Sequence, residues 1–329
     1  MILFFRKTVP HFFSIEKVFF AVAEKLQAQV SIKKVFLPYH TSSVPNMIRN
    51  LAFARKQKDT VYHVTGDVHY LVLALPSKRS ILTIHDCVFL HRHQGFKRWF
   101  LQRLFLNWPV KHSKIITTIS EQSKREIIKF SGCAPEKIRV INNPVNPQIY
   151  FKPKEFNSVK PRLLFLGSTP NKNLPRAIEA IKNIPCHLHI VGIVPEAEQV
   201  LLQQYGIEYT TSLNLTESQL ADTFYEADLL YFPTLYEGFG LPIIEAQKAG
   251  RPVLTSNLSP MKEVAGPGGC LVDPIDAQSI RDGLLRIIKE SAYRESLVTD
   301  GFENVKRFAV EKVAAEYLAL YKEVEAGLG

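Results

Sequence analysis

The sequence predicts an α/β protein built from two doubly wound parallel sheets, one in each half of the chain. Short runs rich in β-branched and aromatic residues alternate with helical stretches from end to end, a pattern typical of parallel sheets covered by helices on both faces. The 329 residues suffice for two domains of roughly 150 residues each. A proline-rich segment over residues 143–160 interrupts the alternation and is interpreted as the interdomain linker.

The elements expected in the first half begin with a strand at the N-terminus. Strands are expected over residues 2–5, 30–36, 61–65, 80–85, 114–119 and 138–141, with helices over 14–27, 44–57, 97–111 and 120–131. In the second half, strands are expected over 162–167, 187–192, 207–211, 229–233, 252–256 and 270–272, with helices over 173–183, 195–205, 216–227, 241–249 and 276–290.

The predicted domains follow from this rhythm. The first domain is assigned to residues 1–155 and the second to 156–308, and the tail over 309–329 is expected to be a helix that packs back on the first domain. Two doubly wound sheets place their ligand crevices at the carboxyl ends of the strands, so a site in a cleft between facing domains is expected.

Composition limits the class of protein. Hydrophobic residues make up 46% of the chain, enough for a core in each half. The four cysteines are far apart without a C-x-x-C pair, which argues against disulfides or zinc and for a reduced, cytoplasmic setting. No apolar run approaches the roughly 20 residues of a membrane span, and the first residues read as a strand rather than a signal peptide.

Charge is divided unevenly between the halves. Residues 1–160 carry 26 Lys and Arg against 9 Asp and Glu, a net charge of +17, whereas the remainder carries −7. A basic first half predicts an anionic partner, either a membrane surface at the inner face or a lipid-phosphate acceptor; a solvated basic surface without a partner is the alternative. The chain has no signature of a nucleic-acid module, so nucleic acid is not expected as a partner.

The segment that carries chemistry runs from Ala227 to Ala246. An apolar strand leads into Gly238-Phe239-Gly240-Leu241, and Pro242 follows where a helix begins. Free N–H groups of that first turn can approach an anion or sugar hydroxyls closely.

Two carboxylates flank this turn. Glu245 can accept hydrogen bonds from two ribose hydroxyls, and Glu237 can bind hydroxyls of a transferred sugar. Taken alone, the pair would be read as a loop residue and a solvent-facing helix residue. The Gly-Phe-Gly-Leu-Pro sequence between the two favours a nucleotide-sugar site.

The chain resembles a known family in this segment. The pattern E-G-F-G-L-P-x-x-E-A, followed by A-G-R-P-V-L-T-S-N, is similar to the E-x7-E signature of retaining glycosyltransferases of the GT-B fold, family 4. Further similar segments are T-I-H-D at residues 83–86, T-I-S-E-Q-S-K at 118–124, K-I-R-V-I-N-N at 137–143, F-L-G-S at 165–168 and N-K-N at 171–173. The resemblance covers most of residues 80–325 and implies two facing Rossmann-like domains.

The resemblance also implies roles. Lys172 would neutralise the donor diphosphate with the Gly167-Ser168 turn, Glu245 would bind ribose, and Glu237 with the Phe239-Gly240 backbone would bind the donor sugar. His85 would lie across the cleft near the sugar; a structural pair with Asp86 is its alternative. Family members often carry Arg before the Lys, where this chain has Asn171, and Arg176, or Arg6 and Lys7 of the first domain, are the candidate substitutes.

The implied reaction is transfer of a hexose from a UDP- or GDP-sugar to a glycan or lipid-linked acceptor in surface polysaccharide synthesis. Retention of configuration rests on the resemblance. The chain has no D-x-D pair, so no metal and no cofactor is expected, and helix N-termini with Lys172 would supply the positive potential. A non-hydrolysing sugar-nucleotide 2-epimerase and a non-catalytic partner subunit are the alternatives.

Overall fold

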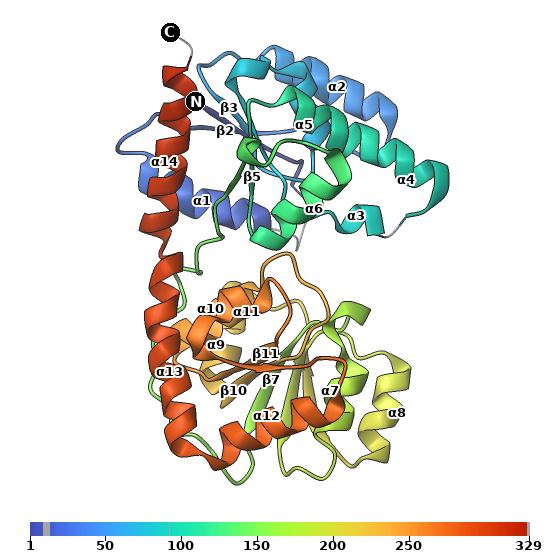
Figure 1. The fold of residues 1–329 in the computed structure, drawn as a ribbon, viewed down its shortest axis with the longest axis vertical. Coiled ribbons are helices and arrows are strands. Elements are labelled where there is room, and N and C mark those ends of the chain that lie inside the picture. The colour runs from blue at the N-terminus through green and yellow to red at the C-terminus, as the bar shows by residue number, and fades with distance from the viewer. Residues whose placement is uncertain (9–13, 92, 328–329) are drawn as a thin grey trace. The chain divides into compact units, whose positions relative to one another are not determined.

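The computed structural model describes residues 1–8, 14–91 and 93–327 (Figure 1). Its chain forms two compact units. Unit 1 comprises Met1–Pro144 with Val310–Gly329, and unit 2 comprises Val145–Ala309. Each holds a six-stranded, fully parallel sheet, which confirms the predicted pair of doubly wound α/β sheets.

The sheet of unit 1 has the strand order β2-β1-β3-β4-β5-β6. Its strands are β1 (Ile2–Phe5), β2 (Lys33–Phe36), β3 (Tyr62–Val64), β4 (Ser80–Thr83), β5 (Ile115–Thr118) and β6 (Ile138–Val140). The helices of this unit are α1 (Ser14–Leu26), α2 (Val44–Arg55), α3 (Val88–His91), α4 (Gly95–Gln102), α5 (Trp108–His112), α6 (Glu121–Ser131) and α14 (Val310–Ala326), and a π-helical turn (Arg103–Asn107) joins α4 to α5.

Strand β1 shows how the sequence builds two cores on one sheet. Successive side chains of a strand point to opposite faces. Ile2 and Phe4 accordingly belong to the core formed with β3, β4 and the α5 region, while Leu3 and Phe5 belong to the core that α1 and α14 cover. All four side chains are buried, which explains an uninterrupted apolar run where a half-exposed strand would alternate.

The C-terminal helix α14 belongs to unit 1 and lies beside α1 (Figure 1). Its buried stripe includes Val313, Tyr317 and Tyr321, which pack in the same core as Leu3. Lys25 on α1 and Glu311 on α14 form a surface ion pair of 2.7 Å.

The sheet of unit 2 has the strand order β12-β11-β10-β7-β8-β9. Its strands are β7 (Arg162–Leu166), β8 (His187–Val191), β9 (Glu208–Ser212), β10 (Leu229–Phe232), β11 (Val253–Ser256) and β12 (Gly269–Val272). Its helices are α7 (Leu174–Ala180), α8 (Glu196–Gln204), α9 (Glu217–Glu226), α10 (Leu241–Ala249), α11 (Met261–Ala265), α12 (Ala277–Lys289) and α13 (Ser291–Val305). Helices α7, α8 and α12 bury one face of the sheet, and Figure 1 shows α9, α10 and α11 over the other.

Residues 145–155 belong to unit 2, although the sequence prediction assigned them to the first domain. Hydrogen bonds within unit 2 hold this segment. The Val145 N–H donates to the Phe308 carbonyl at 2.9 Å, and the Arg251 guanidinium donates to the Lys152 carbonyl at 2.8 Å. The prolines that suggested a linker therefore lie in a segment that is bound to unit 2.

None of the described helices combines the length and the apolar content that a bilayer crossing requires.

Candidate functional site

The topology of unit 2 singles out one place for a ligand. Strands β7 and β10 are neighbours at the middle of the sheet, and the chain leaves them in opposite directions, β7 towards β8 and β10 towards β11. In open parallel sheets, ligands bind outside the carboxyl ends of the strands at such a switch point. The loops that follow, over residues 167–173 and 233–240, contain most of the predicted site residues.

The loop after β7 is shaped by Gly167, which has φ +87°. A Cβ added there would lie 2.9 Å from Cε of Lys172, so the glycine lets the lysine stem lie against the backbone. Asn173 then ties this loop to two others, because its side-chain amide donates to the carbonyls of Pro233 at 3.0 Å and Pro274 at 2.7 Å.

The loop after β10 ends at Gly240, whose φ of +108° turns the chain into α10, with Pro242 in the first turn as predicted. The Phe239 side chain is buried and packs edge-on against Phe308, with ring centroids 5.7 Å apart. The Phe239 side chain therefore serves the packing of unit 2, and any contact of this residue with a ligand would have to come from its backbone.

The two loops meet in a charged pair. Lys172 Nζ lies 2.6 Å from Glu237 Oε1, and both side chains are mostly buried. The Thr234 hydroxyl donates to the same carboxylate oxygen at 2.9 Å, and the ammonium also lies 4.9 Å from the centroid of the Phe232 ring. The structure thus brings together Lys172 and Glu237, which stand far apart in the sequence, and adds Thr234.

Asn171 has a structural task where the family pattern often has arginine. Its carbonyl accepts from the Leu235 N–H at 2.7 Å, and its side-chain amide donates to the Tyr236 carbonyl at 2.9 Å. Asn171 therefore holds the two loops in register. Arg176, considered as a substitute cation, donates to the Asn173 side chain at 3.0 Å and to the Pro274 carbonyl at 3.4 Å.

Glu245 lies in the second turn of α10 with 9% of its surface exposed. Ser168 lines a hollow of about 700 Å³ together with Asn173, Arg176 and Tyr205. This hollow adjoins the loop that follows β7.

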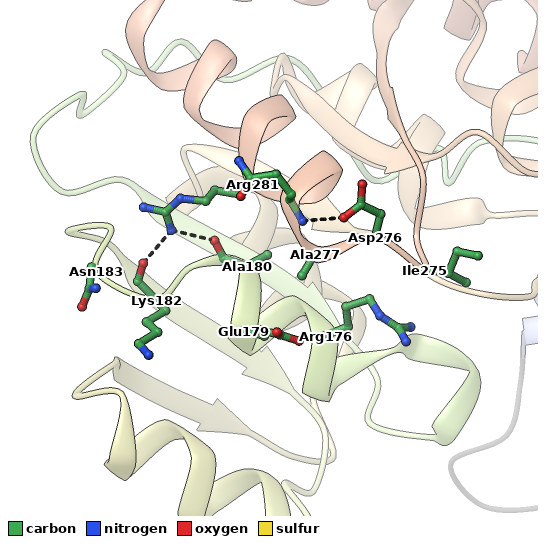
Figure 2. Close-up of a pocket in the computed structure, with 10 residues that line it drawn as sticks. Arg176, Glu179, Ala180, Lys182, Asn183, Ile275, Asp276, Ala277 and Arg281 are labelled. Atoms are coloured by element: carbon green, nitrogen blue, oxygen red, sulfur yellow. Dashed lines mark hydrogen bonds between the residues drawn. The ribbon is translucent and has the colours of Figure 1, made fainter.

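A second hollow of about 710 Å³ opens between α7 and the start of α12 (Figure 2). Two of its charged side chains form hydrogen bonds that hold helix ends in place. Arg281 donates to the carbonyls of Ala180 at 3.1 Å and Lys182 at 2.6 Å, and Asp276 caps α12 by accepting from the Gln278 N–H at 2.9 Å. These bonds satisfy the end of α7 and the start of α12.

Unit 1 has its own switch point, between β1 and β3. Arg6, directly after β1, donates to Glu16 at 2.8 Å and pairs with Asp67, which follows β3. Arg6 and Asp67 line a hollow of about 210 Å³ together with His40. This ion-pair chain fixes the two loops to each other; residues 9–13 of the first loop lie outside the described residues.

His85 follows β4 and is held by its backbone and its ring. The Ser123 hydroxyl donates to the His85 carbonyl at 2.9 Å, and Nε2 lies 2.8 Å from the Thr65 carbonyl. A carbonyl only accepts, so Nε2 carries the proton and the neutral ring presents Nδ1 as an acceptor. Burial lowers the pKa of His85, which keeps the ring neutral at pH 7.

Sequence reasoning missed several members of the two sites. Thr234 was not singled out, although it stands at the carboxyl end of a buried strand three residues before Glu237. Glu16 had no signal, because one acidic residue in the first turn of a helix is common at exposed positions; here it is buried against Arg6.

Replacing Gly167 by Ala is expected to weaken donor binding about tenfold or more, because the new methyl group would push Lys172 aside and a misplaced group costs up to a hundredfold. Isothermal titration calorimetry with a nucleotide sugar measures this change in donor affinity. Gly206→Ala is the matched control, since φ is +61° there but nothing lies within 4 Å of the added Cβ. Both variants should lose about 1 kcal/mol of stability, and equal donor affinity in the two would contradict the prediction.

Two family models match this chain in succession. The model described as Glycosyltransferase Family 4 matches residues 17–149, and the model described as Glycosyl transferases group 1 matches residues 147–303. The second match contains both loops of the unit 2 switch point.

Curated relatives are similar at low identity. The O-antigen chain mannosyltransferase B of Escherichia coli is 26% identical over 82% of this chain and 75% of its own length. The MMP alpha-(1->4)-mannosyltransferase of Mycolicibacterium hassiacum is 28% identical over 70% of this chain and 61% of its own. The O-antigen chain mannosyltransferase RfbU of Salmonella typhimurium is 25% identical over 82% and 84%, respectively.

Solved structures share the fold. Sucrose-phosphate synthase from Thermosynechococcus elongatus superposes with a TM-score of 0.78 at 18% identity, covering 99% of this chain and 98% of that one. Anabaena HepE in complex with UDP and glucose gives 0.75 at 15% identity, covering 98% and 100%.

Proposed function

We propose that this chain, which belongs to glycosyltransferase family 4, transfers a hexose from a nucleotide-sugar donor to a glycan or lipid-linked acceptor. Its family and its GT-B type of fold make it a glycosyltransferase. The observation that carries the donor assignment is the Lys172–Glu237 pair at the switch point of unit 2.

The donor diphosphate is assigned to Lys172 and the Gly167-Ser168 turn. An ammonium has three N–H donors, and Glu237 takes one of them, so Lys172 can also bind phosphate oxygens. The Leu241 N–H at the start of α10 is assigned as a further donor, because Pro242 has no N–H and the Ile243 N–H donates to the Gly240 carbonyl at 3.0 Å. Glu237 and the Gly238–Leu241 backbone bind hydroxyls of the sugar, and Glu245 binds the ribose.

The reaction breaks the bond between the anomeric carbon and the donor phosphate and forms a bond from that carbon to the acceptor hydroxyl oxygen. In the proposed retaining course, the new bond forms on the face that the phosphate leaves. The hydroxyl proton passes to an oxygen of the leaving diphosphate, whose growing negative charge Lys172 stabilises. His85, neutral and with Nδ1 available as an acceptor, binds a substrate hydroxyl.

No metal is assigned to this reaction, because the ammonium of Lys172 and the helix N–H groups supply the positive potential that a leaving diphosphate needs. Among the residues that the structure describes, no group of three His, Cys, Asp or Glu side chains could hold a metal ion.

Mannose is the sugar that we favour, since the curated relatives are named as mannosyltransferases and two act on O-antigen chains by name. Surface polysaccharide synthesis on a lipid-linked acceptor would place the protein in the cytoplasm, in peripheral contact with the inner face of the membrane. The basic first half of the chain, with a net charge of +17, supports that location.

A thermal-shift panel tests the donor assignment. GDP-mannose, UDP-glucose and UDP-N-acetylglucosamine are each added with and without EDTA, beside free mannose as a control. A cognate donor at a hundredfold excess over Kd stabilises the folded state by about 2.7 kcal/mol, with no dependence on EDTA. The absence of a shift with every nucleotide sugar would overturn the assignment, and nuclear magnetic resonance of the product would test retention.

A further inference from the structure

Aromatic side chains are exposed along α4 and the start of α5 in unit 1. Phe96 is 77% exposed, Trp99 52%, Phe100 43% and Trp108 49%. The spacing of Phe96, Trp99 and Phe100 puts these three on one face of α4. Phe96 and Trp99 stack on each other, with ring centroids 5.5 Å apart.

The exposed rings are not needed to pack α4 and α5 onto unit 1, because other side chains of this segment do so. Phe105, in the π-helical turn, packs edge-on against Tyr70 at 5.7 Å and Phe89 at 6.4 Å, and Leu106 is fully buried. The π turn lies between the exposed row on α4 and Trp108, and such single-turn insertions are frequent at functional sites.

The charged residues in the stretch of sequence that carries the aromatic row have one sign. Between Asp86 and Glu121 the sequence holds six Lys and Arg and no Asp or Glu. Lys97, Arg103 and Lys111 are exposed beside the rings, and the Arg103 guanidinium lies 5.4 Å from the Trp99 ring centroid. Large exposed apolar patches rimmed by polar residues mark interaction sites more often than they occur on a surface without a partner.

We propose that this aromatic–basic face (Phe96, Trp99, Phe100 and Trp108 with Lys97, Arg103 and Lys111) docks on the headgroup region of an anionic bilayer. Tryptophan and phenylalanine favour that depth because the ring enters the acyl boundary while polar neighbours stay hydrated. Lys and Arg at its margin are attracted to anionic headgroups. The inference deepens the proposed peripheral location and rests on it.

Charge complementarity favours a lipid surface over a protein partner. An anionic membrane surface is negatively charged over a wide area, which suits a face whose assigned charged residues, Lys97, Arg103 and Lys111, are all cationic. The helix is also too short to cross a bilayer, so a shallow, reversible contact is the mode that fits.

The tryptophans make the test specific, because Trp99 and Trp108 are the only two in the chain. Mixed phosphatidylcholine–phosphatidylglycerol vesicles at low salt are expected to shift their fluorescence to the blue and to carry the protein in flotation. Pure phosphatidylcholine vesicles are expected to bind at least tenfold more weakly, and added salt to weaken the anionic binding.

The double variant Phe96→Gln/Phe100→Gln keeps both reporters and is expected to weaken vesicle binding about tenfold or more. Its matched control is Val44→Gln/Ile48→Gln on α2, which removes exposed apolar residues from the same unit. The double variant Lys97→Glu/Lys111→Glu is expected to lose binding to anionic vesicles, whereas Lys56→Glu/Lys58→Glu should retain most of it.

The outcomes separate the claims. Equal loss of binding in the α4 and α2 variants would overturn this face and leave the peripheral location standing. An absence of binding to anionic vesicles by the unaltered protein would overturn both. Transfer to a soluble acceptor should be unchanged in all four variants, because none alters a residue assigned to the donor or acceptor sites, so failure of the activity proposal would be seen separately.

Discussion

Replacing Lys172 by Ala is expected to slow sugar transfer at least a hundredfold. The ammonium is placed by three features at once: the close approach allowed by Gly167, the 2.6 Å pair with Glu237 and the Phe232 ring. Groups already aimed at developing charge account for about 10² to 10³ in rate when removed singly. Since the charge on the leaving diphosphate grows in the transition state, kcat and kcat/KM should fall together.

Steady-state kinetics with the donor found in the thermal-shift panel measure this loss. Lys182→Ala is the matched control, because Lys182 is an exposed lysine of the same unit at the second hollow (Figure 2). It should keep near-normal turnover. If kcat of the Lys172→Ala enzyme stays within fivefold of that of the unaltered protein, Lys172 does not belong to the catalytic site.

Glu237→Gln should reveal how the pair works. Gln keeps an acceptor for the Thr234 hydroxyl but cancels the negative charge beside Lys172. Combined with Lys172→Ala in a double-mutant cycle, it should show coupling of about 0.5 to 3 kcal/mol, because residues in one network are not additive. Strict additivity would mean that the 2.6 Å contact has no part in turnover.

The sequence predicted all twelve strands of the described residues. Most of them are buried, short apolar runs bounded by turn residues, whereas the edge strands β2 and β9 are largely exposed. It missed α13 for a physical reason. This helix presents no continuous apolar stripe, since its buried positions are Leu297, Gly301 and Asn304. Its backbone at Gly301 instead packs closely against Gly268, since a Cβ added at Gly268 would lie 2.5 Å from the Gly301 Cα, and that complementarity is visible only in three dimensions.

The candidate site likewise has residues that the sequence could predict and residues that it could not. The residues around Glu237 and Glu245 could be found because glycine, proline and carboxylates at fixed spacing describe one local strand-to-helix turn. Thr234 and the bonds of Asn171 could not, because their roles depend on two loops that are distant in sequence and meet only when β7 and β10 pair.

Acid is expected to destabilise unit 1 through a histidine that the sequence left unassigned. His63 on β3 is fully buried; its Nδ1 lies 2.9 Å from the Tyr321 hydroxyl of α14 and its Nε2 lies 2.7 Å from the Thr83 hydroxyl. The ring therefore joins the C-terminal helix to the sheet. Burial lowers the pKa of His63 from 6.5 to about 3, because a charged ring would lose its hydration there.

The sign follows from linkage. Between pH 6.5 and 3, His63 is protonated in the unfolded chain but stays neutral in the folded chain. The free energy of unfolding therefore falls as the pH falls. His63 alone should make the free energy of unfolding about 2 kcal/mol lower at pH 5 than at pH 7, because each pH unit below 6.5 contributes about 1.36 kcal/mol. Urea unfolding followed by tryptophan fluorescence isolates unit 1, since both tryptophans lie in it.

His63→Gln should remove that pH dependence whatever it does to stability at pH 7, because an amide keeps hydrogen bonds to hydroxyls but does not titrate. The exposed His40→Gln serves as the control and should leave the slope between pH 7 and pH 5 as it is. If His63→Gln and the unaltered protein lose the same stability over that interval, the acid sensitivity of unit 1 belongs to other groups. If the loss of stability between pH 7 and pH 5 is smaller by about 2 kcal/mol in His63→Gln, the titration of His63 accounts for that part of the acid sensitivity.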